Sequence, residues 1–373
     1  MVGPLLSSKH RLPSRRPGAV SRQRLAGRLE AVSRSALTVL SAPAGFGKTT
    51  LLAEWLASCA DDAAVAWLSL DRSDNEPALF WTYVVRAMQT AVEGIGSGAL
   101  QVLASASPPI DAALAALLND LDGLSADLVL VLDDYHLVET PEVHDGMTFL
   151  LEHQPPQLHV VVSTRVDPPL PMARMRARGR LVEVRAADLR FTSEEAAAYL
   201  NGPMDLGLSD DDVAALEGRT EGWIAALQMA ALSLQGREDA SAFIAGFAGD
   251  DRYVVDYLAE EVLARQPAEV RQFLLETSVL ERLTGPLCDA VTGRHGGKAT
   301  LVALERANLF LVPLDDRRQW YRYHHLFADV LRAHLLDERP DQVAELHRRA
   351  SEWFEVHDDM SQAISHADRK SVV

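Results

Sequence analysis

Cysteine is scarce in this sequence, which has 373 residues and only two cysteines, Cys59 and Cys288. Two thiols so far apart provide neither a disulfide framework nor the ligand spacing of a zinc site. Long hydrophobic runs are also missing, and no stretch approaches the ~18 to 20 apolar residues of a membrane helix. The basic residues near the start are not followed by the apolar segment of a secretory signal. We therefore expect a cytoplasmic protein with no membrane partner.

Positive charge is in short supply. The 36 lysines and arginines are outnumbered by 53 acidic residues, which gives a formal net charge of -17. This balance argues against a chain that grips a nucleic-acid backbone by itself, because phosphate contacts need clustered Lys and Arg. Hydrophobic residues at 48% and charged residues at 24% are typical of soluble globular proteins, and the length predicts two or three packed units.

Short apolar stretches alternate with helical patterns in the first half of the chain. Most of these stretches lack polar alternation, as expected for parallel strands that are covered on both faces. Helices are predicted at Thr49–Cys59, Pro77–Val92 and Ile110–Leu121. The alternation predicts a doubly wound parallel sheet. The predicted strands are residues 36–41, 64–70, 128–133, 158–164 and 181–185.

After Arg185 the strand signal stops and helical periodicity takes over. Thr192 and Ser193 are expected to cap a helix, with Glu194 and Glu195 in its first turn. One short strand pair is predicted within residues 309–324, and two amphipathic helices close the chain around a turn at 358–359. The expected parts are an N-terminal arm with the segment leading into the sheet (1–35), the α/β domain (36–190), an all-α helical domain (191–267), a smaller unit (268–340) and a final helical region (341–373).

The segment Ala42–Thr49, APAGFGKT, matches the phosphate-loop pattern GxxxxGK[ST] except that Ala42 replaces the first glycine. It follows a predicted strand and opens a predicted helix, whose N-terminal dipole favours anions. Lys48 would neutralise the β- and γ-phosphates, and the Thr49 hydroxyl would bind Mg²⁺. The alternative is a chance glycine turn. The residues predicted to contact ATP or ADP are Ala42, Gly45, Phe46, Gly47, Lys48, Thr49 and Thr50.

Two acidic residues, Asp133 and Asp134, end the apolar stretch LVLVLDD. Beside a phosphate loop, Asp133 is predicted to hold Mg²⁺, through water, and Asp134 to orient or activate the attacking water. The alternative is a helix cap or a solvated turn. Because a glutamate at position 134 would reach further than Asp134, we expect slow hydrolysis.

Arg165 ends the following strand, in VVVSTR, where it could sense the γ-phosphate at the ligand crevice of a parallel sheet. The alternative is a surface arginine at the end of a strand. His324, in YRYHHLF, is read from its surroundings as a core histidine.

Six segments in sequence order form a recognisable set: SAPAGFGKTTLLAEW, WLSLDRSDNEPALFWTYV, LVLDDYHLV, STRVDPPLPMARMRARGRLVEV, TEGWIAALQMAALSL and ERANLFLVPLDDRRQWYRYHHLFADVLR. In these segments the chain resembles the N-terminal part of a MalT-like, LuxR-type transcriptional regulator of the large ATP-binding class, in the STAND branch of P-loop ATPases. The resemblance covers almost the whole chain.

This resemblance implies a nucleotide switch in which residues 268–340 are a winged-helix-like domain. It implies that ATP sits between the P-loop, helical and winged-helix domains, and that inducer and ATP favour a self-associating form that hydrolysis resets. It places the histidine of the family on His324, as a phosphate contact. Arg22 is a weaker candidate contact, with a structural ion pair as the alternative.

The family continues into a helical-repeat sensor and a DNA-binding helix-turn-helix, whereas this chain stops after what resembles the first helix pair of the repeats. We therefore expect a truncated module, with an unknown inducer and with DNA contacted only through a region that this chain lacks. Two other functions stay open. One is a P-loop kinase or other ATP-consuming enzyme, for which we find no acceptor motif. The other is a scaffold that holds nucleotide without hydrolysing it.

Overall fold

The computed structural model describes residues 5–15, 18–59, 63–237, 239–249 and 251–370. The chain divides into two compact units. The first comprises Met1–Ala42 and Phe46–Leu189, and the second comprises Pro43–Gly45 and Arg190–Val373. The division therefore falls inside the predicted phosphate loop. None of the described helices is long and apolar enough to cross a membrane.

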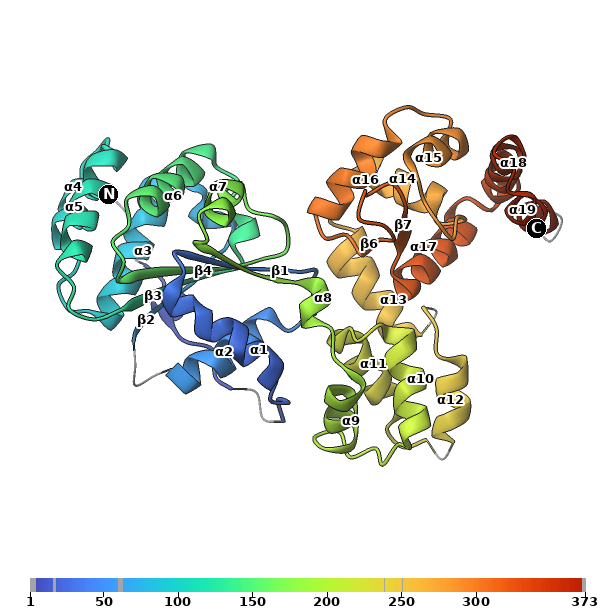
Figure 1. Cartoon of the computed structure of the whole chain (residues 1–373), viewed down its shortest axis with the longest axis horizontal. Coiled ribbons are helices and arrows are strands. Elements are labelled where there is room, and N and C mark those ends of the chain that lie inside the picture. Colours follow the sequence, from blue (N-terminus) through green and yellow to red (C-terminus); the bar gives the residue numbers. More distant parts are fainter. Residues whose placement is uncertain (1–4, 16–17, 60–62, 238, 250, 371–373) are drawn as a thin grey trace. The chain divides into compact units, whose positions relative to one another are not determined.

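The first unit is built on a five-stranded sheet in the order β2-β3-β4-β1-β5. Every neighbouring pair is parallel, with Leu40 opposite Ser163 where β1 meets β4. In Figure 1, α1 and α2 lie on one side of the strands and α6 and α7 on the other. The α/β fold expected from the sequence is thus confirmed. The strands are β1 (Leu37–Ser41), β2 (Ala64–Ser69), β3 (Leu128–Asp133), β4 (Leu158–Thr164) and β5 (Leu181–Arg185).

Helices of the first unit follow the strands in the expected alternation. The three predicted helices correspond to α2, α3 and α5. Four further helices, α1, α4, α6 and α7, occupy segments for which the sequence analysis predicted no helix. The helices are α1 (Gln23–Leu29), α2 (Lys48–Cys59), α3 (Pro77–Ala91), α4 (Ser97–Leu103), α5 (Ile110–Asp122), α6 (Pro141–His153), α7 (Met172–Ala177) and α8 (Ala186–Leu189).

The described part of the N-terminal arm is anchored by a buried charged contact. A short 3-10 helix, Ser7–His10, carries Lys9, whose ammonium lies 2.7 Å from an Asp74 carboxylate oxygen and 2.9 Å from Asp71. Lys9 is 6% exposed and Asp74 is fully buried. A buried carboxylate needs a cation close by, so the arm is tied to the sheet unit by charge.

Among its described residues, the second unit is mainly helical, with one antiparallel pair of strands, β6 (Leu311–Pro313) with β7 (Tyr321–Tyr323), and an isolated bridge between Leu283 and Tyr321. Its first helix, α9 (Ser193–Asn201), has the predicted cap: Thr192 accepts from the Glu195 amide, and the Glu195 side chain accepts from the Thr192 amide. The next helices are α10 (Asp210–Thr220), α11 (Ile224–Leu234), α12 (Ala240–Gly246) and α13 (Arg252–Leu258), which runs into a π-helical turn at Ala259–Leu263.

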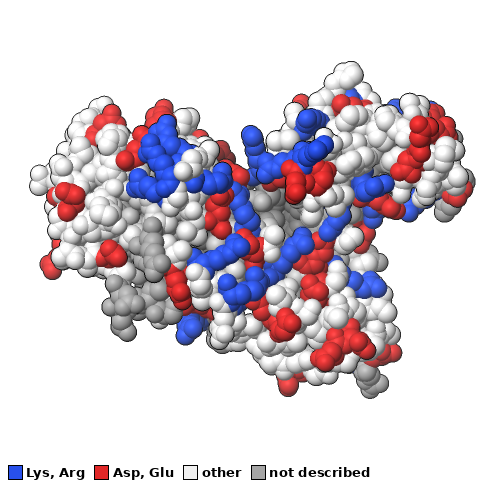
Figure 2. Space-filling view, viewed as in Figure 1, with Lys and Arg blue, Asp and Glu red and all other residues white. Residues whose placement is uncertain are grey.

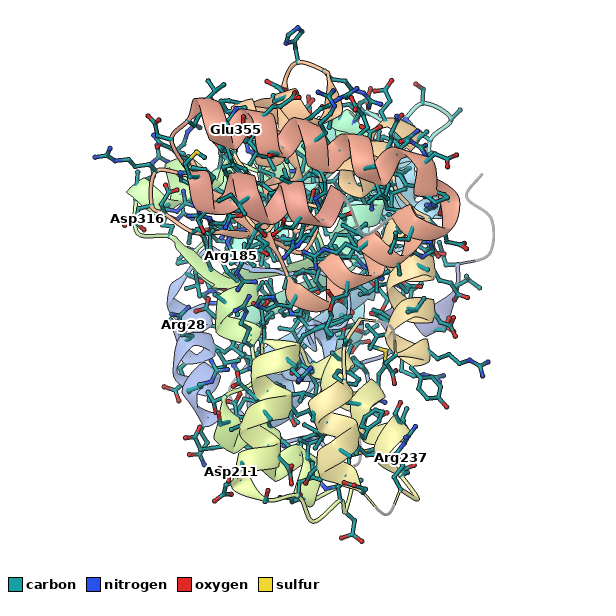
Figure 3. All side chains as sticks on the ribbon, turned by 90° about the vertical axis from the view of Figure 1, so that its right-hand side faces the viewer. Arg28, Arg185, Asp211, Arg237, Asp316 and Glu355 are labelled. Atoms are coloured by element: carbon teal, nitrogen blue, oxygen red, sulfur yellow. The ribbon has the colours of Figure 1, made fainter. Side chains whose placement is uncertain are left out.

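The remaining helices of the second unit surround the strand pair and end the chain. The last two, α18 and α19, lie side by side in Figures 1 and 3. Their buried faces meet at His347 and His366, whose Nδ1 atoms are 2.8 Å apart. The helices are α14 (Ala268–Thr277), α15 (Gly285–Thr292), α16 (Gly297–Arg306), α17 (His325–Glu338), α18 (Pro340–Val356) and α19 (Met360–Lys370).

Charges of both signs are mixed over the surface. Figure 2 shows arginine and lysine gathered over α7 of the first unit. Two arginines of α7 are paired, Arg174 with Glu152 and Arg176 with Glu183. The local excess of positive charge is therefore smaller than the colour alone indicates.

Candidate nucleotide-binding site

The predicted phosphate loop connects the end of β1 to the start of α2. Gly45 and Gly47 have φ values of 75° and 76°, a left-handed conformation that residues with a side chain rarely adopt. Ala42 and Phe46 are buried at its two ends, and Thr50 is half-buried in the first turn of α2. The loop leads into the N-terminus of α2, and backbone amides at a helix N-terminus are the arrangement that binds phosphate.

Lys48 is buried at 7% exposure, and its ammonium donates to the Ala42 carbonyl across 2.8 Å. Burial, followed by the positive charge of Arg165, lowers the pKa of Lys48 to about 8, although Asp134 and Asp133 oppose this shift. Two cations held this close repel each other, and an anion between them would relieve the repulsion. The arrangement is therefore suited to a polyanionic ligand.

Asp133 and Thr49 meet beside Lys48, although they come from different elements. The Thr49 hydroxyl donates to Asp133 Oδ2 across 3.0 Å, and the Asp134 amide donates to Asp133 Oδ1 across 3.1 Å. Asp133 is 4% exposed at the end of β3. A hydroxyl and a carboxylate are ligands that Mg²⁺ accepts, since it takes its other ligands from water and substrate phosphates. The donor set therefore fits this ion, with Thr49 and Asp133 as the residues that would hold it.

Asp134 and Arg165 follow their strands directly, as the sequence predicts. Asp134 has φ of 57° and a side chain that is 46% exposed, 3.8 Å from His136 Nδ1. This left-handed turn separates its carboxylate from the buried Asp133. Arg165 is half-buried after β4, close enough to Lys48 to lower its pKa. The roles assigned to Asp134 and Arg165 in hydrolysis stay predictions.

His324 and Arg22, the two remaining candidates, lie in different units. His324 is 2% exposed in the second unit, and its Nε2 lies 3.0 Å from the Thr220 carbonyl. Burial lowers the pKa of His324 to about 4, so the ring is neutral at pH 7. Arg22 donates to the Leu189 carbonyl across 2.8 Å, a structural hydrogen bond inside the first unit. The proposed contact of His324 with phosphate stays a prediction.

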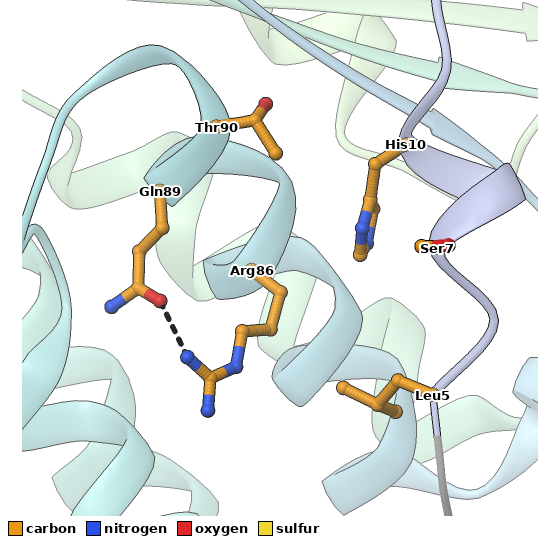
Figure 4. Close-up of a pocket in the computed structure, with 6 residues that line it drawn as sticks. All are labelled: Leu5, Ser7, His10, Arg86, Gln89 and Thr90. Atoms are coloured by element: carbon orange, nitrogen blue, oxygen red, sulfur yellow. Dashed lines mark hydrogen bonds between the residues drawn. The ribbon is translucent and has the colours of Figure 1, made fainter.

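Trp223 is the residue near the loop that sequence reasoning did not single out. Its indole N–H donates to the carbonyl of Ala44, 179 positions earlier in the chain. The sequence signal for it was its place in TEGWIAALQMAALSL, one of the segments that carry the family resemblance. A separate open hollow of about 280 Å³ is lined by residues of the arm and of α3 (Figure 4). Its lining, which includes His10 and Arg86, contains none of the predicted site residues.

The lowered pKa of Lys48 makes a pH dependence of nucleotide binding an expected result. With a pKa of about 8, Lys48 loses its charge as the pH rises through that value. We expect the affinity for ATP to fall about tenfold between pH 7.5 and pH 9, where most Lys48 side chains are neutral. Calorimetric titration at the two pH values measures this fall. In Lys48→Arg the charge persists at both, so an equal fall in that variant would contradict the assignment.

Comparisons with known proteins find one matching domain model and several relatives. Residues 259–343 match the model of the MalT winged helix domain. The chain is 36% identical over 367 residues to the serine/threonine-protein kinase PknK of Mycobacterium tuberculosis, covering 98% of this chain and 33% of that protein. It is 36% identical over 366 residues to the HTH-type transcriptional regulator MalT of Yersinia enterocolitica, covering 97% of this chain and 40% of that protein.

Among solved structures, a Walker-type ATPase of Pyrococcus abyssi matches with a TM-score of 0.54 at 15% identity, covering 86% of this chain and 98% of that chain. At that identity the match shows the fold alone. The chain spans about a third to two-fifths of the length of the curated relatives that it matches. Sheet topology, phosphate-loop sequence and the winged-helix match agree: the chain combines a P-loop NTPase fold with a MalT-type winged helix domain, and almost all of it is similar to a part of MalT regulators.

Proposed function

We propose that this chain is a nucleotide-dependent switch that binds ATP with Mg²⁺ and hydrolyses it slowly to ADP. The observation that carries the proposal is the meeting of Lys48, Thr49 and Asp133 in the first unit. Lys48 is buried at 7% exposure, and the Thr49 hydroxyl donates to Asp133 Oδ2 across 3.0 Å. A buried cation beside a hydroxyl and a carboxylate is the set of groups that a nucleotide phosphate and its Mg²⁺ require.

The residues of the first unit have distinct parts in this proposal. Lys48 binds the β- and γ-phosphates, while Thr49 and Asp133 hold Mg²⁺, which would neutralise charge on the transferred phosphoryl group. Asp134 orients the attacking water from a short, half-exposed side chain. Arg165 responds to the presence of the γ-phosphate. We propose His324 as a further phosphate contact, which would require that neutral, buried ring to approach the nucleotide.

The same proposal places the chain in a longer regulatory protein. The MalT relative is an HTH-type transcriptional regulator, of which this chain covers 40%. We propose that DNA is bound through residues outside this chain, that an inducer sets the balance between states, and that the active state self-associates. The net charge of -17 supports assigning DNA contact to another region.

The rate of phosphate release under single-turnover conditions tests the proposed hydrolysis. We expect a Mg²⁺-dependent rate between about 10⁻⁴ and 10⁻² s⁻¹, the range of P-loop proteins without a partner that completes the site. Asp133→Asn should lower the rate at least about tenfold, because one carboxylate charge facing Mg²⁺ is lost. Consumption of ATP only with an added acceptor would favour a kinase instead. Bound nucleotide with no turnover would favour a scaffold.

A further inference from the structure

Trp223 contacts the tip of the phosphate loop from the second compact unit, to which Pro43–Gly45 also belong. Its indole Nε1 donates to the Ala44 carbonyl across 3.1 Å, and Trp223 is fully buried. Two residues later, the amide of Ala225 donates to the Gly45 carbonyl across 3.2 Å. Two consecutive carbonyls of the loop are thus held by the start of α11.

Gly45 packs tightly against the start of α11. A β-carbon added to Gly45 would lie 2.6 Å from Ala225 Cβ, 2.9 Å from Trp223 Nε1 and 3.0 Å from the Tyr257 hydroxyl. Side chains cannot approach so closely without displacement. The loop tip and the start of α11 therefore have to move together.

The other side of Trp223 faces the strand pair of the winged-helix region. Its ring packs edge-to-face on Phe310, with centroids 5.0 Å apart, and on His324, with centroids 6.0 Å apart. The Thr220 carbonyl accepts from the Trp223 amide at 2.9 Å and lies 3.0 Å from His324 Nε2. Trp223 thus connects the loop tip directly to the buried histidine.

The residues before Trp223 are anchored by charge. The Glu221 carboxylate accepts hydrogen bonds from Nη1 and Nη2 of Arg322 across 2.7 and 2.8 Å. It also forms an ion pair with Arg190, whose Nη2 lies 3.1 Å from Glu221 Oε2. Burial would raise the pKa of Glu221, but the hydrogen bonds from Arg322 and the His325 amide, with nearby positive charge, hold it at about 2. A bidentate, largely buried pair of this kind fixes backbone position. The turn that carries Trp223 is therefore held to β7.

We infer that Trp223 is a positioning residue for nucleotide binding, and that it couples the conformation of the phosphate loop to the winged-helix region. The inference rests on the proposed function, because it assumes that this loop binds phosphate. Trp223 makes no contact with the phosphates in this account. It sets the conformation of Ala44 and Gly45, and it moves with them when nucleotide arrives.

Trp223→Phe tests the inference, since it keeps an aromatic ring and removes the indole donor. We expect the affinity for ATP to fall about five- to twentyfold, because the Ala44 carbonyl loses its partner in a buried setting. The matched control is Trp81→Phe in the first unit. Trp81 is 1% exposed, and its Nε1 has no hydrogen-bond partner among the described residues. That variant should bind ATP as the parent does.

Several outcomes would overturn the inference. A folded Trp223→Phe with the parent's ATP affinity would do so, as would an equal loss in Trp81→Phe. Absence of ATP binding by the parent would instead overturn the proposed function. Hydrogen–deuterium exchange on the parent protein tests the coupling without any substitution. Saturation with MgATP should slow exchange of residues 220–227 relative to the nucleotide-free protein, and unchanged exchange there would contradict the coupling.

Discussion

Lys48→Ala should weaken ATP binding at least about 100-fold, the loss expected when one partner of a buried charge contact is removed. The ammonium is 7% exposed and donates to the Ala42 carbonyl across 2.8 Å, at the base of the loop. Its removal would leave the β- and γ-phosphates without their only lysine in this segment. Of the two neighbouring cations Lys48 and Arg165, only Arg165 would remain.

Fluorescence anisotropy of a labelled ATP analogue measures this loss. Lys298→Ala is the matched control, because Lys298 is exposed on α16 of the second unit. The control should bind the analogue with the parent's affinity, and both variants should melt close to the parent temperature. Parent-like binding by a folded Lys48→Ala would show that the nucleotide site is elsewhere.

Gly45→Ala should destabilise the fold by about 2 to 5 kcal/mol, the sum of a left-handed backbone cost and a steric cost. Gly45 has φ of 75°, and its added β-carbon would lie 2.6 Å from Ala225 Cβ. The variant Gly94→Ala measures the cost of the left-handed backbone alone. Gly94 has φ of 78°, and an added β-carbon would meet nothing within 4 Å.

Urea unfolding of the two alanine variants separates strain from packing. Gly94→Ala should lose about 1 to 2 kcal/mol, the backbone cost alone. Gly45→Ala should lose more, and the difference measures how tightly the start of α11 fits the loop tip. Equal losses would mean that the loop tip relaxes away from Trp223 and Ala225, which would weaken the inferred coupling as well.

The sequence predicted the centre of the sheet well because β1, β3 and β4 are buried on both faces. Residues 128–132 are a continuous apolar run and residues 158–164 are centred on three valines. The strands β3 and β4 occupy the predicted ranges 128–133 and 158–164. Helix α4, by contrast, has seven residues and begins after a left-handed Gly96, too short to show a period. Helix α6 could have been found, since Thr140 and Pro141 start it and Val143, Met147 and Leu150 follow at helical spacing.

Features that depend on residues far apart in the sequence could not be predicted from the sequence. Nothing near Lys9 indicates burial, since its partner Asp74 is 65 positions away. The Trp223–Ala44 hydrogen bond spans 179 positions. The site residues Lys48, Thr49 and Asp133 could be predicted from the sequence, because a phosphate loop and an acidic strand end are local patterns. Tertiary packing decides which residues from other parts of the chain contact the phosphate loop and the strand end.

Calorimetric titration of ATP and of ADP into the parent protein, with and without Mg²⁺, tests the central claim most directly. The account predicts saturable binding of one nucleotide per chain. ATP affinity should depend on Mg²⁺ and differ from that of ADP, as a switch requires. Absence of saturable binding for both nucleotides would contradict the account, and equal affinities for ATP and ADP would leave a nucleotide site without a switch.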